Sequence, residues 1–229
     1  MLWKWRPLRI KPVFIKATFI EIIKVGFPIF VVGIVLSLWG TLNNTLVLKL
    51  GGVANFGLFA LATMVEGSLS IFANAMNQVL YPKMSFSFGS KMPLKEIYKI
   101  PIKPVLIISS ITIPVIITGW FSLPFIVKSI LPNYLGGVEA AQWTLLLLVM
   151  AIFTPYNLIF NVIRKQAHYL ISILCGIFIF IVSFFLLYNL LGFNLIIFPI
   201  CMLFGKVSQF LIAIYYLRNY LKMNNIIYE

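Results

Sequence analysis

Long apolar stretches follow one another along the chain, separated by short segments that carry most of the charge. The stretches with at most one Asp, Glu, Lys or Arg are residues 25–48, 50–82, 104–127, 140–163 and 166–205. A transmembrane helix needs about 20 mostly apolar residues, so the last stretch is long enough for two helices joined by a turn near Gly192. The pattern therefore predicts six transmembrane helices, at about residues 25–48, 55–82, 104–127, 140–163, 169–188 and 195–217.

These helices make the fold class all-α and the chain a polytopic membrane protein. We expect one six-helix transmembrane lobe at residues 25–217, between a basic cytoplasmic lead-in at 1–24 and a cytoplasmic tail at 218–229. Residues 94–100 suit either a short amphipathic helix on the membrane surface or a solvated loop.

Composition excludes a soluble or disordered protein. Apolar residues make up 62% of the 229 residues and charged residues 10%, whereas soluble domains are about 45–50% apolar and about 25% charged. The net charge of +13 would suggest nucleic acid as the partner of a soluble protein. In so apolar a chain it points instead to the positive-inside bias, and no nucleic-acid partner is expected.

The basic residues alternate between the two sides of the predicted membrane. Fifteen of the eighteen fall before the first helix, between the second and third, between the fourth and fifth, or after the last. Lys49 and Lys128 fall on the other side, and Lys206 lies inside a helix. This asymmetry predicts that both termini are cytoplasmic.

The helix predicted at 55–82 carries polar residues on one face. At 100° per residue they fall within a sector of about 100°, and they are Asn55, Thr63, Glu66, Ser70, Asn74, Asn77 and Tyr81. Lipid cannot satisfy such groups, so the face must line a solute cavity or form interhelical hydrogen bonds.

The helix predicted at 25–48 carries small residues on one face, which favours close packing against another helix. These residues are Gly26, Gly33, Ser37, Gly40 and Asn44. Asn43 and Asn44 are also candidates for the mouth of a cavity.

Two ionisable residues lie inside predicted helices, Glu66 and Lys206, at a similar depth. Intramembrane charges usually mark a functional site, so we expect both to line one cavity with Ser70, Asn74, Asn77 and Tyr81. The alternative is a structural ion pair without a transport role.

No catalytic or metal-binding constellation is expected. The chain has no Asp, its single His168 has no acidic or Cys neighbour, and Cys175 and Cys201 lie in apolar runs typical of packing residues. We therefore expect no enzyme activity and no cofactor.

Several segments resemble Wzx-type polysaccharide flippases of the multidrug/oligosaccharidyl-lipid/polysaccharide exporter superfamily. The segments are IKVGFPIF (23–30), TLNN (41–44), KLGGVANFGLFALA (49–62), NQVLYPKM (77–84), LPNY (131–134) and GVEAA (137–141). The resemblance places the chain as the C-terminal six-helix lobe of a two-lobe exporter fold. It implies alternating-access flipping of lipid-linked oligosaccharides, of the polyprenyl diphosphate type, across the bacterial inner membrane, for surface polysaccharides such as O-antigen and lipopolysaccharide. A half-length flippase would need a second lobe or a homodimer.

Three other functions stay open. They are a drug or cation antiporter lobe of the same superfamily, a non-transport membrane protein that binds polyprenyl-linked intermediates, and an integral-membrane transferase. The transferase is disfavoured because the loops lack acidic clusters. A cationic cavity would favour an anionic diphosphate, and an anionic cavity would favour a cation.

Overall fold

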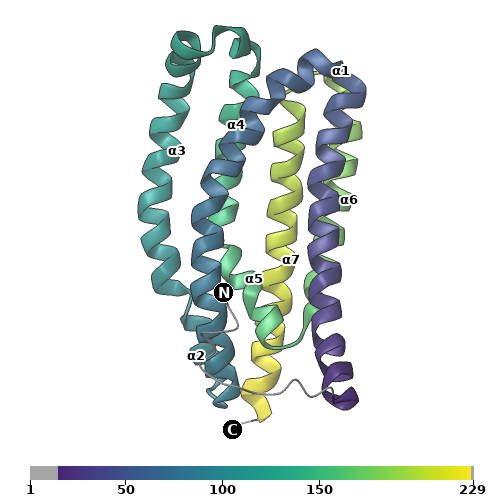
Figure 1. Ribbon diagram of the computed structural model, residues 1–229, viewed down its shortest axis with the longest axis vertical. Helices are drawn as coiled ribbons and strands as arrows, with labels where there is room; N and C mark the ends of the chain where they lie inside the picture. Colours follow the sequence, from purple (N-terminus) through teal and green to yellow (C-terminus); the bar gives the residue numbers. More distant parts are fainter. Residues whose placement is uncertain (1–14, 228–229) are drawn as a thin grey trace, which may run out of the picture.

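The structure is a computed structural model that describes residues 15–227, except the side chains of Leu69, Phe72, Ala73 and residues 223–227. All regular elements in this range are helices: α1 (Lys16–Gly89), α2 (Leu94–Lys99), α3 (Ile102–Ile130), the 3-10 helix η1 (Pro132–Gly137), α4 (Val138–Ile152), α5 (Thr154–Val162), α6 (Gln166–Leu191) and α7 (Ile197–Ile227) (Figure 1). The parts of the predicted lead-in and tail at 1–14 and 228–229 lie outside the described residues.

The first helix turns back on itself. A straight helix of its 74 residues would be about 110 Å long, far more than the roughly 30 Å of a bilayer core. Figure 1 shows α1 rising, turning over at the top and descending again. The turn lies at Gly52, whose φ of 72° and ψ of 179° are accessible essentially only to glycine. We call residues 16–51 the first limb of α1 and residues 53–89 the second limb.

The two predicted helices, 25–48 and 55–82, are present as the two limbs, and the single residue Gly52 takes the place of the loop predicted between them. One residue absorbs the change of direction, so helical geometry continues on both sides of it. The helix also begins at Lys16 rather than near residue 25, because most of the side chains between Lys16 and Lys24 are apolar and extend the helical run.

The predicted helix at 140–163 is divided between α4 and α5. Pro155 has no N–H to donate to the carbonyl of Ala151, which ends the α4 ladder at Ile152. The hydroxyl of Thr154 donates to that carbonyl at 2.7 Å instead. A polar side chain thus stabilises the kink that proline creates.

The predicted turn between the last two helices is confirmed. Helix α6 ends at Leu191, Gly192 takes a φ of 69°, and α7 begins at Ile197. The backbone N–H of Ile196 donates to the side-chain oxygen of Asn194 at 3.0 Å, which orders the start of α7. The segment at 94–100, for which a helix and a loop were both open, contains the short helix α2.

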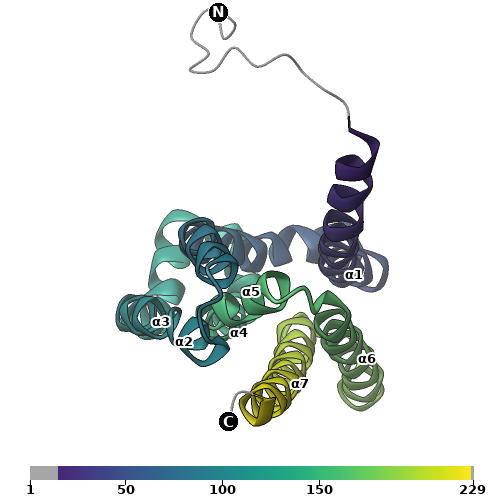
Figure 2. The same cartoon turned by 90° about the horizontal axis from the view of Figure 1, so that it is seen from below.

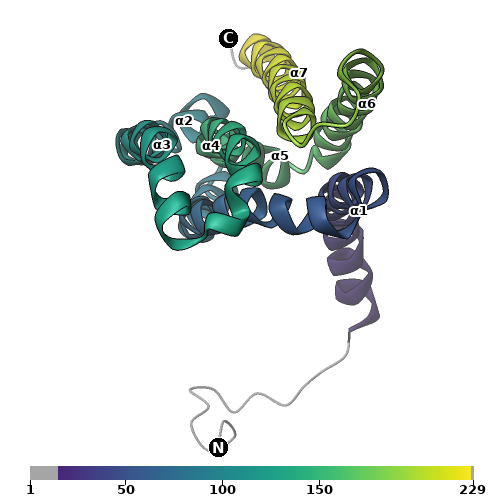
Figure 3. The ribbon, with the colours of Figure 1, turned by 90° about the horizontal axis from the view of Figure 1, so that it is seen from above.

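Five segments of the described residues are long and apolar enough to cross a membrane, as a polytopic membrane protein requires. They are Lys16–Ser68, Leu94–Ile130, Pro132–Val162, Gln166–Leu191 and Ile197–Lys222. Figures 2 and 3 show the first limb of α1 beside α6 and the second limb beside α3 and α4, with α7 across the bundle from α1. The core lies where α4, α6 and α7 meet the two limbs.

Candidate functional site

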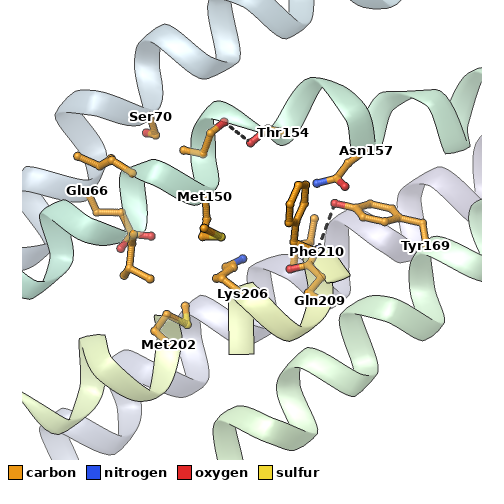
Figure 4. Close-up of a pocket in the computed structure, with 14 residues that line it drawn as sticks. Glu66, Ser70, Met150, Thr154, Asn157, Tyr169, Met202, Lys206, Gln209 and Phe210 are labelled. Carbon is orange, nitrogen blue, oxygen red and sulfur yellow. Dashed lines mark hydrogen bonds between the residues drawn. The ribbon is translucent and has the colours of Figure 1, made fainter. Parts of the chain in front are cut away.

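A cavity of about 210 Å³ lies between both limbs of α1, the α4–α5 kink, α6 and α7 (Figure 4). Its polar lining comes from four helices and includes one residue of each charge. The polar residues are Glu66, Ser70, Thr154, Asn157, Tyr169, Lys206 and Gln209, and the other lining residues are apolar.

The ammonium of Lys206 is held by an aromatic ring. Its Nζ lies 4.2 Å from the centroid of the Trp39 ring, within the range of a cation–π interaction. Trp39 is 1% exposed, and the first limb of α1 carries it into the bundle. Among the described residues, no hydrogen bond or ion pair satisfies this ammonium. Lys206 therefore keeps its N–H donors available to whatever enters the cavity.

Two glycines make room for Trp39. A Cβ on Gly205 of α7 would lie 2.7 Å from the Trp39 ring and 2.8 Å from the carbonyl oxygen of Gly176 on α6. A Cβ on Gly176 would lie 3.0 Å from the same ring. Because neither residue has a Cβ, the backbones of α6 and α7 approach closely and the indole fits against both.

Glu66 belongs to the same cavity without pairing directly with Lys206. Both side chains extend into it in Figure 4, and their charges interact across it. In the part of the chain that the structure describes, their nitrogen and oxygen atoms do not come within 4.0 Å. Since Glu66 itself is exposed, the carboxylate lies on the open side of the cavity and the ammonium on the closed side.

A second polar pair lies one helical turn beyond Lys206. The side-chain amide of Gln209 donates to the hydroxyl of Tyr169 at 3.4 Å, and both residues are buried. Tyr169 stacks on Phe160, with ring centroids 5.6 Å apart. This wall joins α5, α6 and α7, and the Thr154 kink and Asn157 lie beside it.

The structure divides the predicted cavity residues into three groups. Glu66, Ser70 and Lys206 line the cavity described above. Asn74, Asn77 and Tyr81 line a separate shallow depression farther along the second limb.

Asn43 and Asn44 line neither of these two sites. Asn43 is 7% exposed, and its side-chain oxygen has no hydrogen-bond partner among the described residues. The glycine face of the first limb also differs from its prediction, because a Cβ on Gly26, Gly33 or Gly40 would meet no atom within 4 Å. Within this chain that face is open, so its prediction as a packing surface is wrong here.

Trp39, Tyr169 and Gln209 line or shape the site but were not among the predicted site residues. Gln209 had a detectable signal, since it is a polar residue three positions after Lys206 in an apolar run and therefore on the same helix face. Trp39 and Tyr169 had none, because an aromatic residue in an apolar run is indistinguishable from a core residue until the neighbouring helices are placed.

The sequence model for a family described as polysaccharide biosynthesis protein matches residues 1–135, more than half of the chain. The chain belongs to this family. The match covers α1 to α3 and thus includes Trp39 and Glu66, while Lys206 lies beyond it. No curated protein and no solved structure matches the chain. With its apolar helices, this member of the polysaccharide biosynthesis protein family is a membrane protein with a role in polysaccharide synthesis or export.

Proposed function

We propose that the chain forms one lobe of a flippase that moves lipid-linked oligosaccharide precursors across the bacterial inner membrane, by a non-enzymatic transport mechanism. The family membership supports a polysaccharide role. The observation that carries the transport proposal is the Lys206 ammonium, which lies inside the bundle against the face of Trp39 and contacts no anionic group among the described residues.

A charge in this position needs compensation, because burial of an unpaired ammonium is costly. The diphosphate of a lipid-linked saccharide would supply it, with Lys206 as its cationic partner. Gln209 and Asn157 line the same cavity and offer uncharged donors for phosphate or sugar hydroxyls. The Ser70 hydroxyl donates to the carbonyl of Gly67 and offers its oxygen as an acceptor for a sugar hydroxyl. Glu66 on the open side would repel the diphosphate, which limits how tightly the cavity holds it.

A second lobe is part of the proposal. Glu66 and Asn74 are exposed on the second limb, and lipid would leave both groups unsatisfied. A facing lobe, from a partner chain or from a second copy in a two-fold dimer, would close the cavity over them. The open glycine face of the first limb offers a further surface for close helix contact.

A complementation assay tests the transport role. Residues 1–229 are expressed, alone and with a candidate first lobe, in a strain that lacks its own flippase, and surface polysaccharide is measured. We expect rescue that falls at least tenfold with Lys206→Gln and persists with Lys128→Gln, an exposed lysine far from the cavity. Equal activity of Lys206→Gln and the unaltered protein would refute the role of Lys206. Full rescue by a strictly monomeric chain would refute the proposal that transport needs a second lobe.

Topology is tested separately. We propose six crossings with both termini cytoplasmic, the two limbs of α1 counting as two. Single cysteines near Gly52, in η1 and at Phe193 should react with an impermeant thiol reagent from outside intact cells. Cysteines at Lys95 and Arg164 should react only after permeabilisation. Outside labelling at Lys95 would contradict this arrangement.

A further inference from the structure

A second pocket, of about 470 Å³, lies where α5, α6 and α7 end or begin, away from the Lys206 cavity. Its floor is apolar, with Phe160 and Ile163 both buried. Polar and aromatic residues make up the rest of the lining: Lys165, His168, Tyr216, Asn219, Tyr220 and Lys222. None of the described residues that line the pocket is acidic, so these residues carry a net positive charge.

Each lysine is held by a well-defined part of the fold. The backbone N–H of Lys165 donates to the carbonyl of Phe160 at 2.8 Å and closes the turn between α5 and α6. Its ammonium lies 5.5 Å from the centroid of the Tyr220 ring, which directs it toward α7. Lys222 follows on the same helix two residues later. The two cations therefore line one pocket, Lys165 from the α5–α6 turn and Lys222 from α7.

Aromatic packing shapes the wall between the lysines. The His168 ring meets Tyr216 edge to face, with centroids 5.1 Å apart. This contact joins α6 to α7 and holds the start of α6 against the end of α7. The hydroxyl groups of Tyr216 and Tyr220 and the amide of Asn219 add uncharged hydrogen-bonding groups to the cationic pair.

The depth of the pocket points to the membrane surface. One apolar segment long enough to span begins at Gln166, directly after Lys165, and the apolar run of α7 gives way to charged sequence at Arg218 and Lys222. The lysines thus lie at the boundary between apolar and charged sequence, where lipid phosphates lie. Figure 1 shows the start of α6 and the end of α7 at the same end of the molecule as α2.

We propose that this pocket binds the phosphate of an anionic membrane phospholipid between Lys165 and Lys222. The tyrosines and Asn219 contact its glycerol and ester groups, and Phe160 and Ile163 contact the first carbons of an acyl chain. Basic pockets between transmembrane helices are a recurrent way to bind anionic headgroups. The site is separate from the transport cavity and does not depend on the flippase proposal.

Native mass spectrometry of the full chain, released from nanodiscs of equal phosphatidylglycerol and phosphatidylcholine, tests this site. We expect phosphatidylglycerol to be retained preferentially. Removal of one lysine by Lys165→Gln or Lys222→Gln should lower its retention about fivefold. Lys165→Arg with Lys222→Arg should keep it. The matched controls are Lys49→Gln and Lys128→Gln, made singly, each of which removes the same charge from an exposed position outside the pocket.

Each outcome decides the proposal. Equal loss in the control variants would mean diffuse surface attraction and would overturn the pocket. Unchanged retention in the Gln variants, with thermal unfolding showing that they fold, would overturn it too. Displacement of phosphatidylglycerol by millimolar inorganic phosphate would assign the pocket to a soluble phosphate rather than a lipid. Because these nanodiscs contain no lipid-linked saccharide, a negative result leaves the transport proposal intact.

Discussion

The two limbs of α1 belong to one helix but pack in opposite ways. The first limb enters the core mainly through Trp39, Val32 and Val47, while large side chains such as Phe27 and Phe30 stay more than 60% exposed. The second limb buries a broader set against α4 and its neighbours: Phe59, Leu61, Ala62, Leu80 and Met84.

This difference shows how little contact suffices to place a functional group in a membrane bundle. A lipid-facing helix needs no apolar cover, so the first limb can depend on one large residue fitted against Gly176 and Gly205. The second limb must satisfy polar side chains, and it needs both wide packing and an aqueous space. The cavity lies between these two kinds of surface.

Removal of Trp39 should have the largest effect on stability. Trp39→Ala leaves a hole between α1, α6 and α7, and we expect the free energy of unfolding to fall by about 3–5 kcal/mol. Titration with sodium dodecyl sulfate, monitored by circular dichroism, measures this loss. Leu38→Ala, at a neighbouring position that is 59% exposed, should change the free energy by less than about 0.5 kcal/mol. Equal losses for both would mean that Trp39 does not anchor the limb.

A substitution at the Gly52 turn should have the second largest effect on the free energy of unfolding. Gly52→Ala forces a side chain into a backbone conformation reserved for glycine, at a cost of about 1–3 kcal/mol in the free energy of unfolding. Gly57→Ala is the matched control, since Gly57 is helical and its Cβ would meet no atom within 4 Å. A Gly52→Ala protein as stable as the control would place the turn elsewhere.

The coupling between Glu66 and Lys206 should be smaller. Because the charges interact without contact, a double-mutant cycle with Glu66→Gln and Lys206→Gln should give an interaction free energy of about 1 kcal/mol. The corresponding cycle with Glu66→Gln and Lys49→Gln should give none, since Lys49 does not line the cavity. A coupling above about 3 kcal/mol would indicate a direct ion pair in the membrane.

A substitution on the open glycine face should have the smallest effect on the free energy of unfolding. Gly40→Ala meets no neighbour in the chain and removes backbone freedom from the unfolded state, so the free energy of unfolding should rise by about 0.5 kcal/mol. If a second lobe packs there, the same change should reduce polysaccharide rescue in cells. Unchanged rescue would show that a second lobe does not pack on this face.

The membrane architecture could be predicted because charge and hydropathy are local properties of the sequence. Apolar runs located the helices, and Gly192 located the last turn. The course of α1 through Gly52 was not predicted, since consecutive Gly51 and Gly52 are as typical of a loop as of a single break. The α4–α5 kink lies at Pro155, a residue type that favours kinks, whereas the contribution of Thr154 was not predicted.

The site was predicted in part. Glu66, Ser70 and Lys206 do line one cavity, as the matched depth of the two charges and the helical periodicity around Glu66 suggested. Asn74, Asn77 and Tyr81 share the face of Glu66 by helical periodicity but lie against different surroundings farther down the helix. A helical wheel describes direction around the axis and contains no information about which neighbour is present at each depth.

The close approach at Gly51 has a consequence for the order of assembly. A Cβ there would collide with the ring of Phe193, which belongs to the connection between α6 and α7. During synthesis, the hairpin of the two limbs emerges from the ribosome long before Phe193 does. The contact at the tip of the hairpin therefore forms only after the connection between α6 and α7 has been synthesised. The turn between the two limbs is thus packed by Phe193, a residue that is synthesised about 140 positions later.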